Sequence, residues 1–167
     1  MLIIVCGLPG SGKTSISKML AKRFSAAHIN SDVVRKRIFE KPAYTDEEKR
    51  KVYLAMADEA GKSLKEKNVI LDATFYRKEY REMARKAAEK AGTDAYIIVC
   101  ELGERETQKR MEEREMGPSD ADFEVYLKLK ETFEPVDGEH LKIDCSLPKK
   151  EIMKRIEEFL EGAGKRL

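Results

Sequence analysis

The segment GLPGSGKT at residues 7–14 restricts the fold of this chain more than any other part of its sequence. The residues before it, LIIVC, form a short apolar run bounded by a glycine, which is typical of a buried strand in a parallel sheet. Helical spacing follows over residues 13–24, with apolar side chains at Ile16, Met19, Leu20 and Phe24. A glycine-rich loop between a strand and a helix is the context that identifies a phosphate-binding loop, or P-loop.

The residues of this loop match the chemistry of a nucleoside triphosphate. Its glycines let backbone N–H groups turn inward around phosphate oxygens, and the N-terminus of the following helix adds positive potential. We expect Lys13 to reach the β- and γ-phosphates of ATP, and the Thr14 hydroxyl to bind Mg²⁺. The predicted ATP-binding residues of the loop are Gly7, Pro9, Gly10, Ser11, Gly12, Lys13, Thr14 and Ser15.

Strand-like and helix-like segments alternate along the 167 residues. Predicted strands cover residues 2–6, 26–29, 68–72, 95–101 and 141–145, and predicted helices cover residues 13–24, 32–39, 45–65, 77–91, 104–115, 120–132 and 149–160. This order predicts a three-layer α/β fold, a parallel sheet with helices on both faces, in one domain over residues 1–167. Ligands bind at the carboxyl ends of such strands, and the motifs below fall there.

Charge and apolar content narrow the possible partners. The 33 Lys and Arg residues nearly balance the 31 Asp and Glu residues, so the net charge gives no sign of a nucleic-acid or membrane surface. No apolar stretch reaches membrane-spanning length, and a strand already begins at residue 2, so we expect a cytoplasmic protein. The cysteines end apolar runs and the histidines lack partners at a visible spacing. We expect buried thiols and structural or incidental imidazoles at Cys6, Cys100, Cys145, His28 and His140.

Asp32 and Arg35 follow the second predicted strand. The end of that strand lies beside the P-loop, where a small kinase has its acceptor pocket. A carboxylate at this position can take the proton of an acceptor hydroxyl as the γ-phosphoryl group leaves ATP. Arg35 lies one turn along the same helix face, where its planar guanidinium group suits an anionic acceptor. The alternative is that Ser31 or Asp32 only caps the helix and that Arg35 is solvated.

The third strand ends in Asp72 after three apolar residues, a pattern similar to a Walker B strand. Asp72 would hold Mg²⁺ or one of its waters, unless it only begins a turn. Arg77, Lys78 and Arg81 begin the next helix, where they either touch substrate or form a solvated face.

Arg110 and Arg114 lie four residues apart on one helix face, just before a Gly-Pro pair that breaks the helix. A segment that follows such a break can move, so residues 110–122 form a candidate lid. An arginine on this lid can close over the transferring phosphate and neutralise the charge that develops on it. Both arginines would need no ligand if they only made ordinary ion pairs with Glu112, Glu113 and Glu115.

Together these segments resemble the zeta-toxin and polynucleotide-kinase-like group of P-loop kinases. The resemblance covers about residues 1–160 and rests on GLPGSGKTS (7–15), INSDVVRKR (29–37), VILDATF (69–75) and RMEEREMGPSDADFEVY (110–126). It implies a five-stranded parallel sheet in the adenylate-kinase-like order 2-3-1-4-5, with a small helical lid.

At the working positions the chain is similar to phage-type polynucleotide 5′-kinases. The resemblance implies Asp32 as the general base, Arg35 as the arginine that binds the acceptor phosphate, and Arg114 as the transition-state contact. Val33 stands where the phage enzyme has a second acid, so the acceptor site departs from that pattern. The remaining implied roles are catalysis by Lys13, nucleotide binding by Thr14 and Arg110, and a strand-end metal site at Asp72.

We therefore expect an ATP- and Mg²⁺-dependent phosphotransferase that acts on a hydroxyl, with an RNA or DNA 5′ end as one candidate acceptor. Small-molecule, nucleotide-sugar, antibiotic and aminoacyl-tRNA hydroxyls stay open as acceptors, because the motifs identify the transfer chemistry better than the acceptor. A different class is a nucleotide-binding switch that hydrolyses NTP slowly. It would use the same P-loop without needing Asp32 or the paired lid arginines.

Overall fold

The computed structural model describes residues 1–113 and 122–164 of the chain. Its centre is a five-stranded, all-parallel sheet in the order β2-β3-β1-β4-β5, which confirms the predicted α/β fold and strand order. The strands are β1 (Leu2–Cys6), β2 (Ala27–Asn30), β3 (Val69–Asp72), β4 (Ala95–Glu101) and β5 (Leu141–Asp144). The helices of the described residues are α1 (Lys13–Arg23), α2 (Ser31–Ile38), α3 (Asp46–Ser63), α4 (Lys78–Lys90), α5 (Glu104–Glu112), α6 (Phe123–Thr132) and α7 (Lys149–Gly164).

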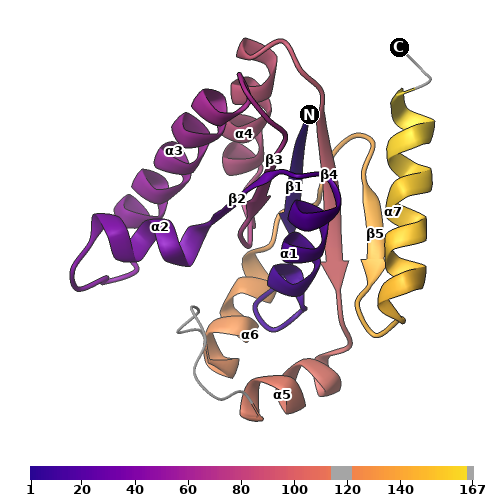
Figure 1. Cartoon of the computed structure of the whole chain (residues 1–167). Helices are drawn as coiled ribbons and strands as arrows, with labels where there is room; N and C mark the ends of the chain where they lie inside the picture. Colours follow the sequence, from indigo (N-terminus) through magenta and orange to yellow (C-terminus); the bar gives the residue numbers. More distant parts are fainter. Residues whose placement is uncertain (114–121, 165–167) are drawn as a thin grey trace.

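Helices cover both faces of the sheet because its central strands bury side chains on both sides (Figure 1). Leu2 and Ile4 of β1 belong to a core cluster on one face, together with residues of α3 and α4. Ile3 and Val5 belong to a second cluster on the other face, together with residues of α1 and α7. Successive residues of a strand point to opposite faces, so the continuous apolar run LIIVC requires this double cover.

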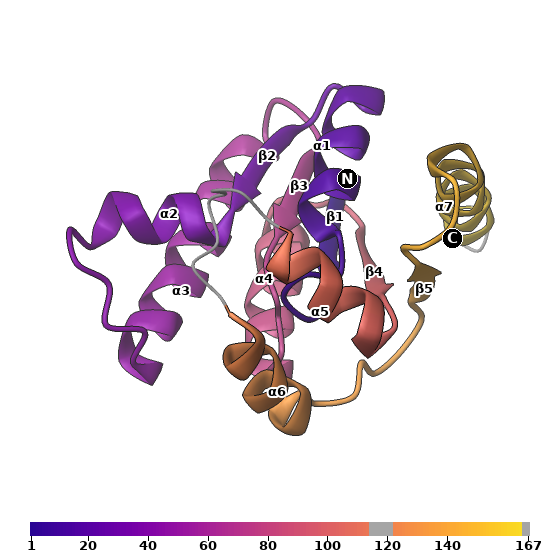
Figure 2. The ribbon, with the colours of Figure 1, turned by 90° about the horizontal axis from the view of Figure 1, so that it is seen from below.

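The register of the strands brings three chain segments together at the carboxyl end of the sheet. Val5 of β1 and Asn30 of β2 both pair with Asp72 of β3. The P-loop follows β1 and α2 follows β2, so the loop, the start of α2 and Asp72 meet at one end of the sheet. Figure 2 views this end, with α2 and α3 on one side and α5 and α6 across the strand ends.

Asn30 explains where α2 begins. Its side-chain oxygen accepts hydrogen bonds from the backbone N–H groups of Asp32 (3.0 Å) and Val33 (3.2 Å). Asn30 is therefore the N-cap, and the alternative that Ser31 or Asp32 caps this helix is wrong. Because the cap is the last residue of β2, the strand ends one residue later than predicted and the helix follows it without a loop.

The other elements begin and end within a few residues of their predicted bounds. α5 ends at Glu112 instead of residue 115, and α7 continues to Gly164 instead of ending at residue 160.

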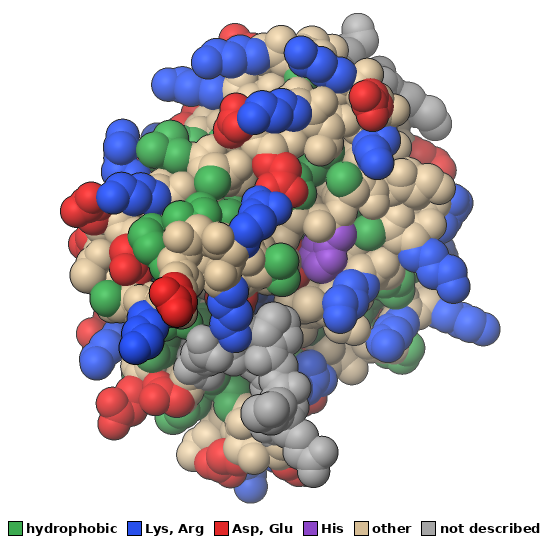
Figure 3. All heavy atoms as spheres, turned by 60° about the vertical axis from the view of Figure 1, so that its left-hand side comes forward, with side chains coloured by type: hydrophobic (Ala, Val, Ile, Leu, Met, Phe, Trp, Pro, Cys, Tyr) green, Lys and Arg blue, Asp and Glu red, His purple; other side chains and the backbone are tan. Residues whose placement is uncertain are grey.

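All three cysteines are buried, as predicted. No helix among the described residues has the length and apolar character that crossing a membrane requires. The predicted cytoplasmic location stays a prediction. On the face that carries α2 and α3, acidic and basic side chains are intermixed (Figure 3).

Candidate functional site

The P-loop adopts backbone angles that favour glycine. Gly7 and Gly12 have φ angles of 142° and 95°. A Cβ atom on Gly7 would also lie only 2.3 Å from the carbonyl oxygen of Cys100. Gly12 is the N-cap of α1, and no side chain caps that helix. The N-terminus of α1 can therefore bind an anion, which the helix dipole favours.

Lys13 lies inside this loop, opposite two acids. Its ammonium group donates a 2.8 Å hydrogen bond to the carbonyl oxygen of Leu8. Burial lowers the pKa of Lys13, and the nearby charges of Asp72 and Asp32 oppose that shift. Both carboxylates therefore lie close enough to act on the ammonium charge. The ammonium group of Lys13 can bind a phosphate group, and the carboxylates can bind a metal ion.

Asp72 is the buried centre of the site, with 1% of its surface exposed. Its Oδ2 atom accepts a 2.8 Å hydrogen bond from the Asn30 side-chain amide and lies 3.0 Å from His28 Nε2. Burial alone would raise the pKa of Asp72. The hydrogen bonds, together with the charge of Lys13, outweigh burial and hold that pKa below its ordinary value. Asp72 is therefore an ionised carboxylate at neutral pH.

The contact between His28 and Asp72 was not visible in the sequence. The two residues are 44 positions apart, whereas the sequence offered His28 no partner. His28 and Asn30 are two positions apart in β2, so both side chains point to the same face of the sheet and reach one carboxylate on the neighbouring strand. Two polar positions at this spacing in a short buried strand were the available signal. His140 lies elsewhere, 2.9 Å from the carbonyl oxygen of Gly138.

The second oxygen of Asp72 fits a metal ion. Asp72 Oδ1 is buried and has no hydrogen-bond partner among the described residues. Leaving such an atom unpaired is unfavourable, so a ligand there would be stabilising. The Thr14 hydroxyl lies close by, since it contributes to the lowered pKa of Asp72. This pair fits Mg²⁺, which prefers oxygen ligands and often takes only one or two from the protein when phosphates supply others. Within residues 1–113 and 122–164, no group of three His, Cys, Asp or Glu side chains could hold a metal.

Arg35 is buried, with 7% of its surface exposed. The alternative that it is a solvated arginine is therefore wrong. Its Nε and Nη1 atoms have no hydrogen-bond partner among the described residues. The guanidinium carbon lies 4.8 Å from the centre of the Tyr44 ring, a cation–π contact that orients the group. An arginine oriented in this way, with two donors unused, can bind an anion.

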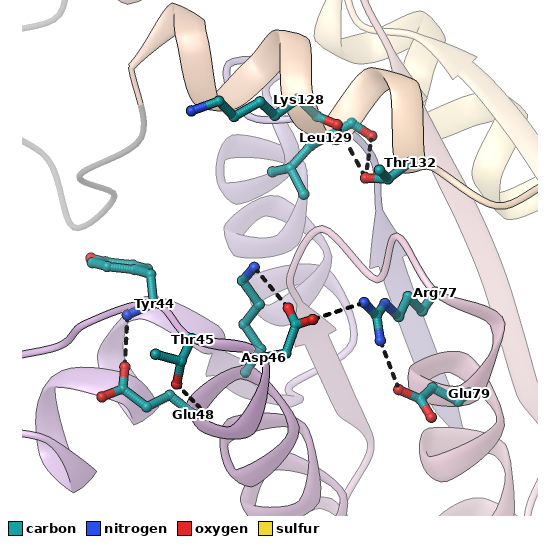
Figure 4. Close-up of polar contacts among 10 residues, drawn as sticks. Tyr44, Thr45, Asp46, Glu48, Arg77, Glu79, Lys128, Leu129 and Thr132 are labelled. Carbon is teal, nitrogen blue, oxygen red and sulfur yellow. Dashed lines mark hydrogen bonds and ion pairs between the residues drawn. The ribbon is translucent and has the colours of Figure 1, made fainter.

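Tyr44, which sequence reasoning missed, is held by the loop before α3. Its φ angle of 56° lies in the left-handed region, which residues other than glycine rarely adopt. The Glu48 carboxylate accepts hydrogen bonds from the backbone N–H groups of Ala43 (2.9 Å) and Tyr44 (2.8 Å), as Figure 4 shows for Tyr44. Thr45 caps α3 in turn through a 3.2 Å bond from the Glu48 N–H. Strained backbone of this kind often marks a ligand site.

One cavity of about 850 Å³ joins these groups. It brings together Lys13 and Thr14 of the P-loop, Asp32 and Arg35 of α2, and Asp72 of β3. Other predicted nucleotide contacts that line it are Pro9, Gly10, Gly12, Ser15 and Arg110. Gly7 and Ser11 line a neighbouring pocket of about 560 Å³ instead. Sequence reasoning missed the rest of the wall, which includes Tyr44, Asp46, Lys49, Tyr76, Val125, Lys128, Leu129 and Thr132.

The three basic residues around the start of α4 have different environments. Arg77 lines the cavity, as a substrate contact would. Lys78 is exposed and forms an ion pair with Asp137 at 2.7 Å. Arg81 is only 2% exposed and donates to two backbone carbonyl oxygens, at 2.8 and 2.6 Å. Neither a solvated face nor a substrate contact describes Arg81, which instead joins α4 to two loops.

Arg110 borders the P-loop from the end of α5. Its Nη2 atom donates to Glu106 at 2.8 Å and to the carbonyl oxygen of Cys145 at 3.5 Å. Its Nη1 atom lies 3.6 Å from the position that a Cβ atom on Gly12 would take. Arg114 and most of the candidate lid, residues 114–121, lie outside the described residues.

Comparison with protein families gives a match over most of the chain. The profile of a family described as AAA domain matches residues 2–136. The chain belongs to this AAA domain family. The matched part of the AAA domain includes the P-loop, Asp32, Arg35 and Asp72. None of the curated proteins compared with the chain matches it.

Solved structures share the fold of this AAA domain at low sequence identity. A gluconokinase from Sinorhizobium meliloti 1021 has a TM-score of 0.75 and 21% identity, with 98% of this chain and 93% of that chain covered. Kti12 from Chaetomium thermophilum, in complex with ADP-AlF3, has a TM-score of 0.75 and 19% identity, with 96% and 98% covered. The APS kinase CysC from Mycobacterium tuberculosis, in complex with AMPPNP and APS, has a TM-score of 0.71 and 18% identity, with 96% of each chain covered. At these identities the likeness establishes a P-loop kinase-like fold.

Proposed function

We propose that this chain is an ATP- and Mg²⁺-dependent phosphotransferase that acts on an acceptor hydroxyl, in a single domain over residues 1–167. The observation that carries the proposal is one cavity lined by Lys13 of the P-loop, the carboxylate of Asp32 and the buried guanidinium group of Arg35. A protein that only binds nucleotide needs the first of these groups. The second and third suit an acceptor, because they supply a proton acceptor and an anion-binding group beside the phosphate loop.

Asp32 acts as the general base in this proposal. It stands in the first turn of α2, where the Asn30 cap binds its backbone N–H at 3.0 Å, and it affects the pKa of Lys13. The acceptor oxygen attacks the γ-phosphorus of ATP, and the bond from that phosphorus to the β–γ bridging oxygen breaks. The proton of the acceptor hydroxyl passes to the Asp32 carboxylate as the new phosphate ester forms.

Lys13 and the metal-binding residues neutralise the phosphate charge. Thr14 and Asp72 would hold Mg²⁺, which supplies positive charge at the β- and γ-phosphates when bound. Lys13 would exchange its hydrogen bond with Leu8 for one with a phosphate oxygen. The backbone of the predicted loop residues would bind the remaining phosphate oxygens.

The lid arginines complete the proposal. Arg110 borders Gly12, which supports a contact between Arg110 and the nucleotide. The role of Arg114 in the transition state rests on its spacing of four residues from Arg110 and on the family resemblance. Both arginines would act from the proposed lid, about residues 110–122.

The acceptor carries an anionic group near its hydroxyl in this proposal. A buried guanidinium group with two unused donors is costly unless an anion completes it, which favours a charged acceptor at Arg35. A polynucleotide 5′-hydroxyl meets this condition, because a phosphate stands nearby in the same nucleotide. The solved structures of similar fold include a gluconokinase and an APS kinase, so small-molecule acceptors stay candidates beside RNA and DNA ends.

A screen for transfer of a labelled γ-phosphate tests the proposal. The purified protein with Mg²⁺ and ATP would be offered 5′-hydroxyl DNA and RNA oligonucleotides, tRNA, nucleosides, nucleotide sugars, sugars and aminoglycosides. We expect one class to become labelled, and Lys13→Ala to abolish the labelling. Bound ATP that releases inorganic phosphate slowly, with no acceptor labelled, would instead support the nucleotide-binding switch.

A further inference from the structure

The cavity carries an excess of positive charge. Its described lining residues include three acidic side chains and six basic ones, which are Lys13, Arg35, Lys49, Arg77, Arg110 and Lys128. In the proposed function Lys13 and Arg110 face the nucleotide, and Arg35 faces the acceptor. The other three basic residues have no role in the proposed function. We call Lys49, Arg77 and Lys128 the distal cluster.

The distal cluster comes from elements that supply neither the P-loop nor the proposed base. Lys49 lies on α3, Arg77 is the N-cap residue of α4, and Lys128 lies on α6. Figure 4 shows Arg77 on one side of the space between these elements and Lys128 on the other. Lys128, Leu129 and Thr132 all line the cavity at helical spacing, so one face of α6 borders it.

Two kinds of contact gather Lys49 and Arg77. The Asp46 carboxylate accepts hydrogen bonds from Lys49 at 3.3 Å and from Arg77 at 3.1 Å. The two cations also lie 5.8 and 5.5 Å from the centre of the Tyr76 ring. Because the Asp46 side chain is 66% exposed, its ion pairs stabilise the fold only a little. Stability therefore gives no strong reason to gather two cations on one carboxylate at a cavity wall.

The carboxylates near the distal cluster do not cancel its charge. Asp46 is shared between two cations, and Glu79 lies 3.7 Å from the other side of Arg77. No carboxylate among the described residues forms an ion pair with Lys128. Among residues 1–113 and 122–164, at least one positive charge of the cluster therefore has no acidic partner, even when Glu79 is counted. A surplus cation on a concave wall attracts an anion.

We infer that the distal cluster is a second anion-binding subsite, and that the acceptor carries two phosphate groups, one at Arg35 and one at the cluster. This inference rests on the proposed function, because it takes the cavity to hold the acceptor. Asp46 is then an internal anion that keeps Lys49 and Arg77 gathered and competes with the second phosphate for them. Two sources share this chemistry: a sugar bisphosphate and a short nucleotide chain.

Equilibrium binding tests the inference without requiring transfer. The protein is first saturated with Mg²⁺ and AMPPNP, which fills the P-loop and excludes it as a site for the probes. Calorimetry then compares probes that differ by one phosphate. One pair is a sugar monophosphate and a sugar bisphosphate, and the other is a 5′-hydroxyl dinucleotide without and with a 3′-terminal phosphate. If AMPPNP did not bind, the proposed function would be overturned. If AMPPNP bound but the second phosphate did not tighten the binding of either probe, only the inference would be overturned.

We expect the second phosphate to tighten binding about tenfold in one of the two pairs. The pair that shows this gain tells whether the acceptor is a sugar bisphosphate or a short nucleotide chain. Arg77→Gln and Lys128→Gln should remove that gain and leave the Kd of the one-phosphate probe unchanged. Asp46→Asn should tighten the two-phosphate probe further, because the competing charge is gone. Lys62→Gln, which alters an exposed lysine paired with Asp58 on α3, is the matched control.

Equal affinities within both pairs would overturn the inference. The same holds if Lys128→Gln weakens the one-phosphate and two-phosphate probes alike, or leaves both unchanged. An Asp46→Asn variant that binds the two-phosphate probe no more tightly would show that Asp46 does not compete with a ligand.

Discussion

Asn30 and Asp72 stand side by side at the carboxyl ends of β2 and β3, joined by a 2.8 Å hydrogen bond from the Asn30 amide to Asp72 Oδ2. The oxygen of the same Asn30 side chain caps α2. One residue thereby connects the buried acid of the proposed metal site to the helix that carries Asp32 and Arg35. The relative position of the two halves of the site depends on this connection.

Replacing Asn30 by Ala should destabilise the protein through both contacts. Loss of an N-cap costs about 1 kcal/mol, and loss of a hydrogen bond to a charged group costs about 1.5–3 kcal/mol. We expect the free energy of unfolding, measured by urea denaturation, to fall by about 2.5–4 kcal/mol. Thr45→Ala removes only the cap of α3 and should cost about 1 kcal/mol. Equal losses in the two variants would mean that the bond to Asp72 contributes nothing.

Replacing Asp32 by Asn should slow transfer strongly while ATP still binds. The amide keeps the shape of the side chain but cannot take the acceptor proton, so kcat should fall by roughly 10²–10⁴-fold. Calorimetry with Mg²⁺ and ATP should give a Kd close to that of the unmodified protein. Asp58→Asn, on the exposed part of α3, is the matched control. A near-normal kcat in Asp32→Asn would exclude Asp32 as the base.

The stability of the protein should depend on pH through the ionisation of Asp72. In the folded chain the pKa of Asp72 lies below its ordinary value of 3.8. A carboxyl group of this kind contributes stability above its unfolded-state pKa, and that contribution is lost as the pH falls through its folded-state pKa. We expect the free energy of unfolding to decline more steeply below about pH 4 in the unmodified protein than in Asp72→Asn. Urea denaturation at a series of pH values measures both slopes, and parallel curves would contradict the assignment.

Replacing Tyr44 should affect the acceptor through Arg35. Tyr44→Ala removes a cation–π contact of about 0.5–2 kcal/mol, so the acceptor KM should rise roughly 2–30-fold. Tyr44→Phe keeps the ring, so the acceptor KM of this variant should stay close to that of the unmodified protein. Arg35→Ala should raise the KM more, roughly 10–100-fold, because hydrogen bonds to a charged group are lost.

A thermal melt of Arg35→Ala provides the control for folding. Removing a buried charge with unused donors should leave the Tm unchanged or higher. A large fall in Tm would instead indicate that Arg35 serves mainly to hold the structure together. An unchanged acceptor KM in that variant would indicate that the acceptor does not contact Arg35.

The sequence by itself determined the P-loop and the positions of the strand-end residues. The loop is local, since its glycines and Lys13 act through the backbone of consecutive residues between one strand and one helix. Asp32, Arg35 and Asp72 could be assigned to one end of the sheet because parallel strands share their carboxyl ends. The strand order came from the family resemblance, and the sheet confirms it.

Only the tertiary structure decided which side chains meet. The contacts of His28 and Asn30 with Asp72 join residues 44 and 42 positions apart, and the buried state of Arg81 depends on carbonyl groups of two loops. The face of α6 that borders the cavity was equally hidden, because its spacing fits any surface helix. Local periodicity encodes which way a side chain points within its own element. Strand register and helix packing decide what that side chain then touches, and both are properties of the assembled chain.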